Sequence, residues 1–389
     1  MHIAMVAARY RPFVGGIETH IHEVGTRMVA LGHQVTVLTT DPSGALPTDE
    51  TSAGMRIKRV NAWPRKRDYY FAPGIYRAVA GGPWDIVHFQ GYNTFVAPIG
   101  MCAATRQVRP FVLTFHSGGH SSALRNAIRR SQHALLSPLV ARASRLIGVS
   151  EYEAAFFSKR MRINRARFEV IPNGASLPVP STMTSRHEGQ LVVSVGRLER
   201  YKGHQRVIAA FPELLRWVPD ARLKIVGSGP YEQQLRRLIR SLRLNDRVTI
   251  EAIPSAERQR LSDLLAGAGL VVLLSQYEAH PVAIMEALFL RRPVLVSDTS
   301  GLRELAQKGL CRSIPLNAKP DAIAAAIAEE LEADRQPPDV LLPDWDSCAR
   351  RLIELYEGVL SSAGQTQRSR TAIASGPLGA ERLASDIKR

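Results

Sequence analysis

Apolar residues in the first half of the chain occur either in short continuous runs or at helical spacing. Short apolar runs are typical of buried β-strands, and helical spacing is typical of helices with one buried face. The pattern predicts a strand at 2–8 and a helix at 16–31 that ends before Gly32. It predicts further strands at 34–40, 56–60, 85–90, 110–115, 145–149 and 168–171, with helices between several of them.

The second half of the chain repeats this alternation. The predicted strands lie at 191–195, 222–226, 248–251, 270–275 and 294–297, and the predicted helices at 203–217, 231–242 and 256–266. A short helix is expected to begin at Pro281, as its first helical residue. A last helix is expected at 345–360, where an apolar stripe comprises Trp345, Cys348, Leu352, Leu355, Tyr356 and Val359.

Strands that alternate with helices predict parallel sheets joined by right-handed crossovers. Because 389 residues are too many for one compact core, we expect an α/β protein of two doubly wound, Rossmann-like domains that face each other across a cleft. Segment 173–190 is rich in Pro, Ser and Thr and is expected to link them. The expected parts are an N-terminal domain at 1–180, a C-terminal domain at 181–344, a helix at 345–361 packing back toward the N-terminal domain, and a disordered tail at 362–389.

The composition, 45% hydrophobic and 22% charged, is that of a soluble globular enzyme. No apolar run is long enough for a transmembrane helix, and the N-terminus reads as a strand rather than a signal peptide. Three widely spaced cysteines indicate neither a disulfide framework nor a metal cluster. We therefore expect a protein of the reducing cytoplasm.

The net charge of +16 is unevenly placed. Residues 1–185 hold 22 Lys and Arg against 10 Asp and Glu, and the remainder holds 29 against 25. Such a basic half attracts anionic lipid or phosphorylated substrates; an Arg-rich surface without a binding role is the alternative. Aromatic residues are not interleaved with the basic ones as in nucleic-acid-binding proteins, so we expect no nucleic-acid partner.

Two carboxylates flank the start of the helix at Pro281. Glu278 lies on the loop after the strand at 270–275, and Glu286 lies one to two turns into the helix. Open α/β sheets bind ligands at the carboxyl ends of their strands, and a helix N-terminus suits an anion such as a diphosphate. The alternative is a solvated loop glutamate and a second one on the wet face of the helix.

Two cations are expected at the same edge of the second sheet. Arg197 follows the strand at 191–195, and Lys202 precedes the next helix. A guanidinium fork and a compact ammonium together suit a diphosphate leaving group, although each alone would be read as a solvated surface cation.

Gly15 and Gly16 join the first strand to the first helix and would let a ligand approach the backbone, unless they form a plain tight turn. They do not form the GxGxxG fingerprint, and the absence of this fingerprint disfavours a nicotinamide oxidoreductase. His116, at the end of a strand, is either a sugar-binding group or a satisfied core-edge histidine. From position alone, His20 and His280 are read as exposed. No metal-binding pattern is present, so we expect no metal.

These motifs together resemble a known family, the retaining GT-B glycosyltransferases of family 4. The resemblance covers residues 1 to about 360. The motifs that carry it, in order, are GGIE in the first loop, His116, IPNG at 171–174, GRLERYKG at 196–203, IVGSGP at 225–230, the E-x7-E pair Glu278/Glu286 and GLREL at 301–305.

The resemblance implies a role for each candidate residue. Gly15 and Gly16 would approach the donor diphosphate and sugar, Arg197 and Lys202 would bind the diphosphate, Glu286 would hold the ribose hydroxyls, and Glu278 and His116 would contact the donor sugar. The family loop E-G-F-G is replaced by Glu278-Ala279-His280-Pro281, so Ala279 and His280 line the sugar site and Val282 supplies the backbone N–H for phosphate.

The implied reaction is the transfer of a hexose-type sugar, with retention, from a UDP or GDP sugar to an acceptor hydroxyl. No cofactor and no metal are implied, and the leaving phosphate would take the acceptor proton. The acceptor is a lipid-linked saccharide in polysaccharide or glycolipid assembly, or a soluble natural product; an epimerase on the same fold is a further alternative. The basic stretch 124–145 resembles the amphipathic segment of peripheral members, which implies contact with the inner face of the cell membrane.

Overall fold

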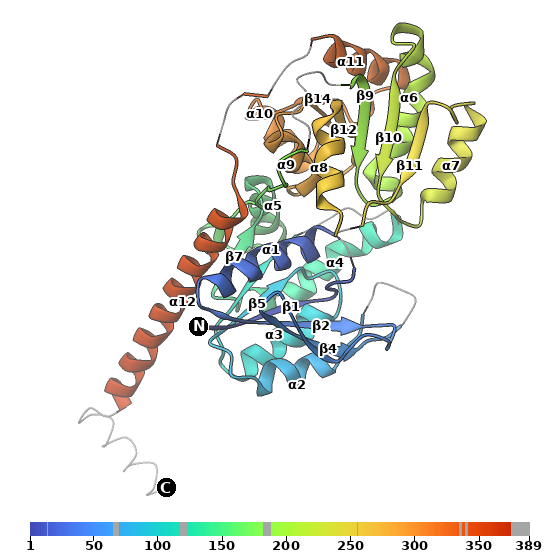
Figure 1. Ribbon diagram of the computed structural model, residues 1–389. Helices are drawn as coiled ribbons and strands as arrows, with labels where there is room; N and C mark the ends of the chain where they lie inside the picture. Colours follow the sequence, from blue (N-terminus) through green and yellow to red (C-terminus); the bar gives the residue numbers. More distant parts are fainter. Residues whose placement is uncertain are drawn as a thin grey trace, which may run out of the picture.

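The computed structural model contains two β-sheets with helices on both faces (Figure 1). It describes residues 1–13, 15–64, 70–116, 123–181, 188–254, 256–333, 337–338 and 341–374. The expected fold class of two Rossmann-like α/β domains is confirmed. Within the described residues, no helix has both the length and the apolar character needed to cross a bilayer.

The N-terminal sheet has eight strands in the order β3-β4-β2-β1-β5-β6-β7-β8. Their bounds are β1 His2–Ala7, β2 Gln34–Asp41, β3 Asp49–Ser52, β4 Met55–Asn61, β5 Ile86–Gln90, β6 Phe111–Thr114, β7 Arg145–Gly148 and β8 Phe168–Val170. All neighbouring pairs are parallel except the edge pair β3–β4. The five helices between them are α1 Gly16–Ala30, α2 Gly74–Gly81, α3 Val96–Arg106, α4 Ala123–Val140 and α5 Glu151–Met161.

Both faces of this sheet are buried, as the continuous apolar runs predict. Along β1, Ala4 and Val6 point into a core beneath α2 to α5, whereas Ile3 and Met5 point into a second core beneath α1. The period of two along the strand thus assigns alternate residues to opposite layers.

The C-terminal sheet has six parallel strands in the order β11-β10-β9-β12-β13-β14. Their bounds are β9 Glu188–Val195, β10 Arg222–Val226, β11 Val248–Glu251, β12 Ala268–Leu273, β13 Val294–Ser297 and β14 Arg312–Ile314. The helices are α6 His204–Trp217, α7 Glu232–Ser241, α8 Arg258–Ala266, α9 Val282–Phe289, α10 Ser300–Gln307 and α11 Pro320–Ala333. Of the linker expected at 173–190, 182–187 lie outside the described residues, and β9 begins at Glu188.

The chain returns to the N-terminal domain in its last helix, α12 (Trp345–Ala374), which packs on α1 (Figure 1). Its apolar stripe, including Trp345, Leu352 and Tyr356, completes the core on the α1 face of the sheet. Gly174 fits beneath it because a Cβ there would collide with the backbone of Trp345.

Residues 362–374, which the sequence analysis assigns to a disordered tail, continue α12 in the structure. This stretch contains no proline and several good helix formers, including Ala, Gln and Arg, and Gly364 lowers helix stability without ending the helix. Residues 375–389 of the expected tail lie outside the described part of the chain.

The two domains contact each other where the loops at the carboxyl ends of their strands meet. Val282, at the start of α9, packs against the apolar cluster that also holds Ile17 of α1. The Tyr152 N–H of α5 donates to Glu304 Oε2 of α10 over 3.1 Å. The loops after β1, β6 and β12, which carry the expected site residues, therefore belong to this side of both sheets.

Candidate active site

The candidate cation Lys202 forms an ion pair with the candidate carboxylate Glu278. Lys202 Nζ donates to Glu278 Oε1 over 2.6 Å, and the two side chains are only 15% and 9% exposed. Ser275 Oγ donates to the same carboxylate oxygen over 2.7 Å. Burial by itself lowers the pKa of Lys202, but the Glu278 carboxylate more than offsets this, and the pKa lies above its ordinary value. Two residues 76 positions apart thus form one charged pair.

The backbone around Glu278 is fixed by the start of α10. The Glu278 N–H donates to Ser300 Oγ over 2.9 Å, and the Gly301 N–H donates to the Glu278 carbonyl over 2.9 Å. A Cβ at Gly301 would collide with the Ala279 carbonyl oxygen, so only glycine permits this approach. The GLREL motif therefore holds the Glu278 loop in place.

Glu286 is buried, with a side chain 3% exposed, and does not lie on the wet face of its helix. Arg258 Nη2 lies 2.5 Å from Glu286 Oε1 and 3.0 Å from the Ser176 carbonyl of the linker. Burial raises the pKa of Glu286, although Arg258 partly counteracts it. Arg258 is a site residue that sequence reasoning missed, because its partners are far away along the chain.

Pro281 is the N-cap of α9 and not its first helical residue, with φ −73° and ψ 118°. The extended ψ follows from this position, because an N-cap residue lies outside the helical region. Val282 is thus the first helical residue, and helix geometry gives its N–H no intrahelical acceptor. It lies on the side of α9 that meets the N-terminal domain.

Arg197 does not share the Lys202–Glu278 pair. Its side chain is 39% exposed and its Nη2 lies 3.2 Å from Glu199 Oε1. Its positive charge is close enough to Lys202 to act on the pKa of that residue, which it lowers, against the larger opposite effect of Glu278. The structure therefore brings the two cations near each other, one buried and one accessible.

The two glycines before α1 differ in what surrounds them. A Cβ on Gly15 would collide with Glu18 Oε2, whereas a Cβ on Gly16 would meet no described atom within 4 Å. The atom beside Gly15 is the end of a flexible side chain, which can move, whereas the space beside Gly16 is open. Val14, of the same loop, is outside the described residues.

His116 is held by a hydrogen bond between its Nε2 and Gln90 Oε1, 2.7 Å apart. Its φ of +43° is uncommon for a residue other than glycine. Burial, and then the neighbouring rings of His20 and His88, hold the pKa of His116 well below its ordinary value. The ring is therefore neutral. Ser117, Gly118 and Gly119, which follow in the sequence, lie outside the described residues.

His20 is buried, 1% exposed, and the expectation that it is a surface residue is wrong. It lies on the side of α1 that faces Trp345, and its ring centroid is 4.6 Å from that of His116. Its Nδ1 lies 3.0 Å from Asn173 Oδ1, and Asn173 Nδ2 donates to the His280 carbonyl over 3.0 Å. His280 is half-buried, and burial lowers its pKa to about 4. The IPNG motif thereby joins α1 to the Glu278 loop.

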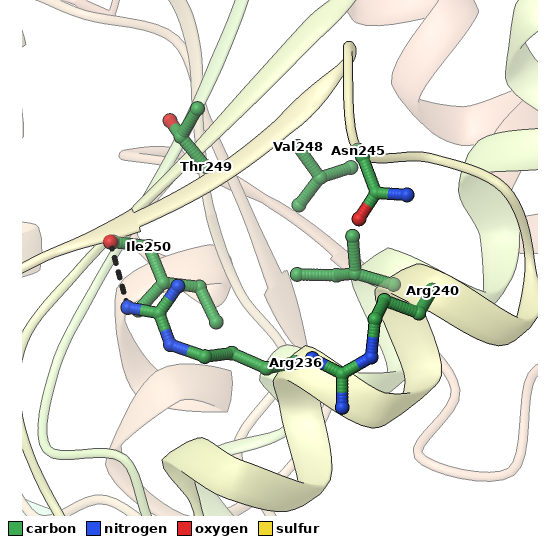
Figure 2. Close-up of a pocket in the computed structure, with 7 residues that line it drawn as sticks. Arg236, Arg240, Asn245, Val248, Thr249 and Ile250 are labelled. Atoms are coloured by element: carbon green, nitrogen blue, oxygen red, sulfur yellow. Dashed lines mark hydrogen bonds between the residues drawn. The ribbon is translucent and has the colours of Figure 1, made fainter.

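A pocket of about 280 Å³ lies elsewhere, between α7 and the edge strand β11 (Figure 2). Arg236 crosses it to the Ile250 carbonyl, 3.3 Å away, and Arg240 lies beside it. None of the expected site residues lines this pocket. No group of three His, Cys, Asp or Glu side chains within the described ranges could hold a metal ion.

The model described as Glycosyltransferase Family 4 matches residues 14–177, and that described as Glycosyl transferases group 1 matches 183–340. The chain is 29% identical to a glycogen synthase of Mycobacterium tuberculosis and 27% identical to the GDP-mannose:cellobiosyl-diphosphopolyprenol alpha-mannosyltransferase of Xanthomonas oryzae pv. oryzae. Each alignment spans 79% of this chain and 81% of the relative.

The solved structure of sucrose-phosphate synthase from Thermosynechococcus elongatus has the same fold. Its TM-score is 0.70 at 20% identity, and the match covers 92% of this chain and 99% of that one. The two Rossmann-like domains define a protein of the GT-B class. The chain belongs to glycosyltransferase family 4 and is a glycosyltransferase.

Proposed function

We propose that the protein is a retaining, metal-independent hexosyltransferase. It transfers the sugar of a UDP or GDP sugar to an acceptor hydroxyl in the assembly of cell-surface polysaccharide or glycolipid. The observation that carries this proposal is the buried Lys202–Glu278 pair, with Glu286 in the next helix, on the side of the C-terminal sheet that meets the N-terminal domain.

The site supplies the contacts that a nucleotide diphosphate sugar needs. Arg197 and Lys202 neutralise the diphosphate, and the N–H of Val282 at the start of α9 donates to it. Glu286 accepts hydrogen bonds from the ribose hydroxyls when Arg258 yields part of its contact. Glu278, with Ala279 and His280 in its loop, and His116 from the other domain contact the sugar.

The reaction breaks the bond between the anomeric carbon and the diphosphate oxygen and forms one from the same face to the acceptor oxygen. The acceptor proton passes to the leaving phosphate oxygen, so the electron pair and the proton both end on the diphosphate. No protein nucleophile is needed, which accords with the tight pairing of Glu278 with Lys202. Two cations beside the diphosphate stabilise the charge that develops on it, the role that a metal has in other transferases.

The proposed acceptor is a lipid-linked saccharide. The Xanthomonas relative has a diphosphopolyprenol acceptor in its name, and the basic N-terminal half of this chain would be attracted to an anionic membrane. We therefore also propose peripheral contact with the inner face of the cell membrane.

The test is nucleotide binding followed by turnover. UDP, GDP, ADP and their common sugar conjugates are titrated, without added metal, against the parent, Glu286→Ala and Glu213→Ala. Glu213 is the matched control, since it pairs with Arg216 on α6, away from the site. We expect one base to raise the melting temperature of the parent and of Glu213→Ala, but not that of Glu286→Ala.

Turnover then decides the reaction. The expected product is a glycoside with the anomeric configuration of the donor, formed only with acceptor present. Equal binding and turnover by Glu286→Ala would refute the site, and an epimerised donor sugar without acceptor would refute the transferase.

A further inference from the structure

A chain of buried hydrogen bonds runs from α12 to His116. Tyr356 of α12 has its hydroxyl 2.5 Å from His88 Nδ1, and Gln90 Nε2 lies 3.2 Å from the same nitrogen. His88 Nε2 lies 2.7 Å from Thr114 Oγ1, and Gln90 Oε1 lies 2.7 Å from His116 Nε2. The side chains come from β5, β6, α12 and the loop after β6, so four parts of the fold meet in this chain of hydrogen bonds.

With the Gln90 amide in this orientation, the donor and the acceptor of each of these four hydrogen bonds are fixed. Gln90 Oε1 can only accept, so His116 Nε2 must donate to it; Gln90 Nε2 can only donate, so His88 Nδ1 must accept. The Tyr356 hydroxyl then donates to His88 Nδ1, and His88 Nε2 donates to Thr114. His116 is left as the Nε2–H tautomer, with a lone pair on Nδ1.

We propose that Gln90, His88 and Tyr356 are positioning residues that hold His116 in the Nε2–H tautomer, so that its Nδ1 accepts a hydrogen bond from a hydroxyl of the donor sugar. The proposal rests on the glycosyl transfer proposed above. It gives α12 a part in shaping the sugar site, although this helix begins only at Trp345, far from His116 in the sequence.

The surroundings of the chain favour a fixed arrangement. His88, Gln90, Thr114 and Tyr356 are all buried, so water does not compete for their hydrogen bonds. Burial holds the pKa of His88 well below its ordinary value and raises that of Tyr356 well above its own. Both groups are therefore neutral at ordinary pH, and the proton positions do not change with pH.

The titratable groups that act on His116 are His20 and His88. Burial lowers the pKa of His20 to about 4, so this ring is neutral as well. Its Nδ1 donates to Asn173 Oδ1, because an amide oxygen can only accept. A positive charge on either ring would disfavour a second proton on His116, so neither ring favours the doubly protonated form.

The first measurement is the tautomer of His116 in the full-length protein without substrate. Nitrogen chemical shifts of ¹⁵N-histidine-labelled protein separate a protonated from an unprotonated ring nitrogen, and His116→Asn assigns the signal. We expect Nε2 protonated and Nδ1 unprotonated in the parent, and a mixture of tautomers in Gln90→Met, which removes both amide bonds at similar side-chain length.

The second measurement is the pH profile of donor kcat/KM. The parent should be flat through the range where a free histidine titrates. Gln90→Glu still accepts from Nε2, but its carboxylate raises the pKa of His116, and the doubly protonated ring has no acceptor. Its kcat/KM should therefore fall as pH falls through that raised pKa, and Gln90→Met should lose about tenfold at all pH values. A purely structural role would not produce this difference in pH profile.

An Nδ1–H tautomer in the parent would overturn the proposal, because it would mean that the Gln90 amide points the other way. An unchanged tautomer in Gln90→Met together with a flat profile for Gln90→Glu would overturn it as well. If Gln90→Met does not fold, the tautomer of His116 in the parent and the pH profile of kcat/KM in Gln90→Glu still test the proposal. Failure of the proposed function is separate: the parent would then turn over no nucleotide sugar, whatever the tautomer.

Discussion

The environment of Glu286 differs strongly from that of a glutamate in water. Its carboxylate is buried, and Arg258 is the cation beside it. Since burial raises its pKa, the folded protein favours the protonated form more than the unfolded chain does. A group with a raised folded pKa contributes stability below its unfolded pKa and loses that contribution as pH rises through the folded pKa. The ionised carboxylate needed for ribose thus costs stability at neutral pH.

The direction of this pH dependence can be tested with Glu286→Gln, which keeps the shape of the side chain and cannot ionise. We expect the free energy of unfolding of the variant to exceed that of the parent at pH 7.5, and the difference to shrink as pH falls toward the ordinary pKa of a glutamate. Urea unfolding of both proteins across this range measures it. A variant that is less stable at pH 7.5 would show that the Arg258 bond outweighs burial.

Gly16 provides a second test at the scale of one residue. Because no described atom would contact a Cβ there, Gly16→Ala should leave the melting temperature unchanged while the new methyl group displaces the donor. We expect kcat/KM for the donor to fall roughly 100-fold. Gly81→Ala in α2 is the matched control, since a Cβ there also meets no described atom within 4 Å. Equal activity of the two variants would remove Gly16 from the site.

Elements with buried faces were predictable from the sequence, and pairings between distant elements were not. β10, β11 and β13 have the predicted bounds because short apolar runs specify strands buried on one or both faces. β3, with the sequence DETS and no buried residue, has no such pattern and is a strand through its antiparallel pairing with β4. Arg258 was missed for the same reason, and the contacts of Asn173 in the IPNG motif were not predicted, since the partners of both residues are set by the tertiary fold.

α12 gives a prediction at the scale of an element. Residues 361–365 are exposed, whereas Trp345 to Tyr356 complete a core. Truncation after Gly364 should leave the melting temperature within about 1 °C of the parent, because surface changes cost little. Truncation after Asp344 should unfold the N-terminal domain, because it exposes the apolar side of α1. Thermal unfolding followed by circular dichroism compares them, and a folded shorter chain would contradict the assignment.

At the scale of the whole molecule, the charge is concentrated in one half. Residues 101–150 hold seven arginines and no acid, and α4 lies in this stretch. Replacing Arg125, Arg129 and Arg130 by Gln should lower partitioning onto anionic vesicles roughly 100-fold, at about 1 kcal/mol for each charge near the surface. The side chains of Arg125 and Arg130 are outside the described residues.

The control for this experiment removes the same charge from the other domain. Arg216, Arg236 and Arg240 lie on α6 and α7, and their replacement by Gln should leave sedimentation with vesicles unchanged. If both triple variants sediment like the parent, the basic half does not bind membrane. If both sediment less, net charge alone explains the attraction.

The return of the chain to its first domain also affects how the protein is made. The last strand of the N-terminal sheet ends at Val170, but α12, which completes one of its cores, begins at Trp345. At about 5–20 residues per second, a ribosome needs roughly 10–35 s to make the intervening segment. During that interval the nascent first domain presents an uncovered apolar surface, and the second domain emerges beside it. The N-terminal domain can therefore bury this surface only after the second domain has been synthesised and α12 has followed it.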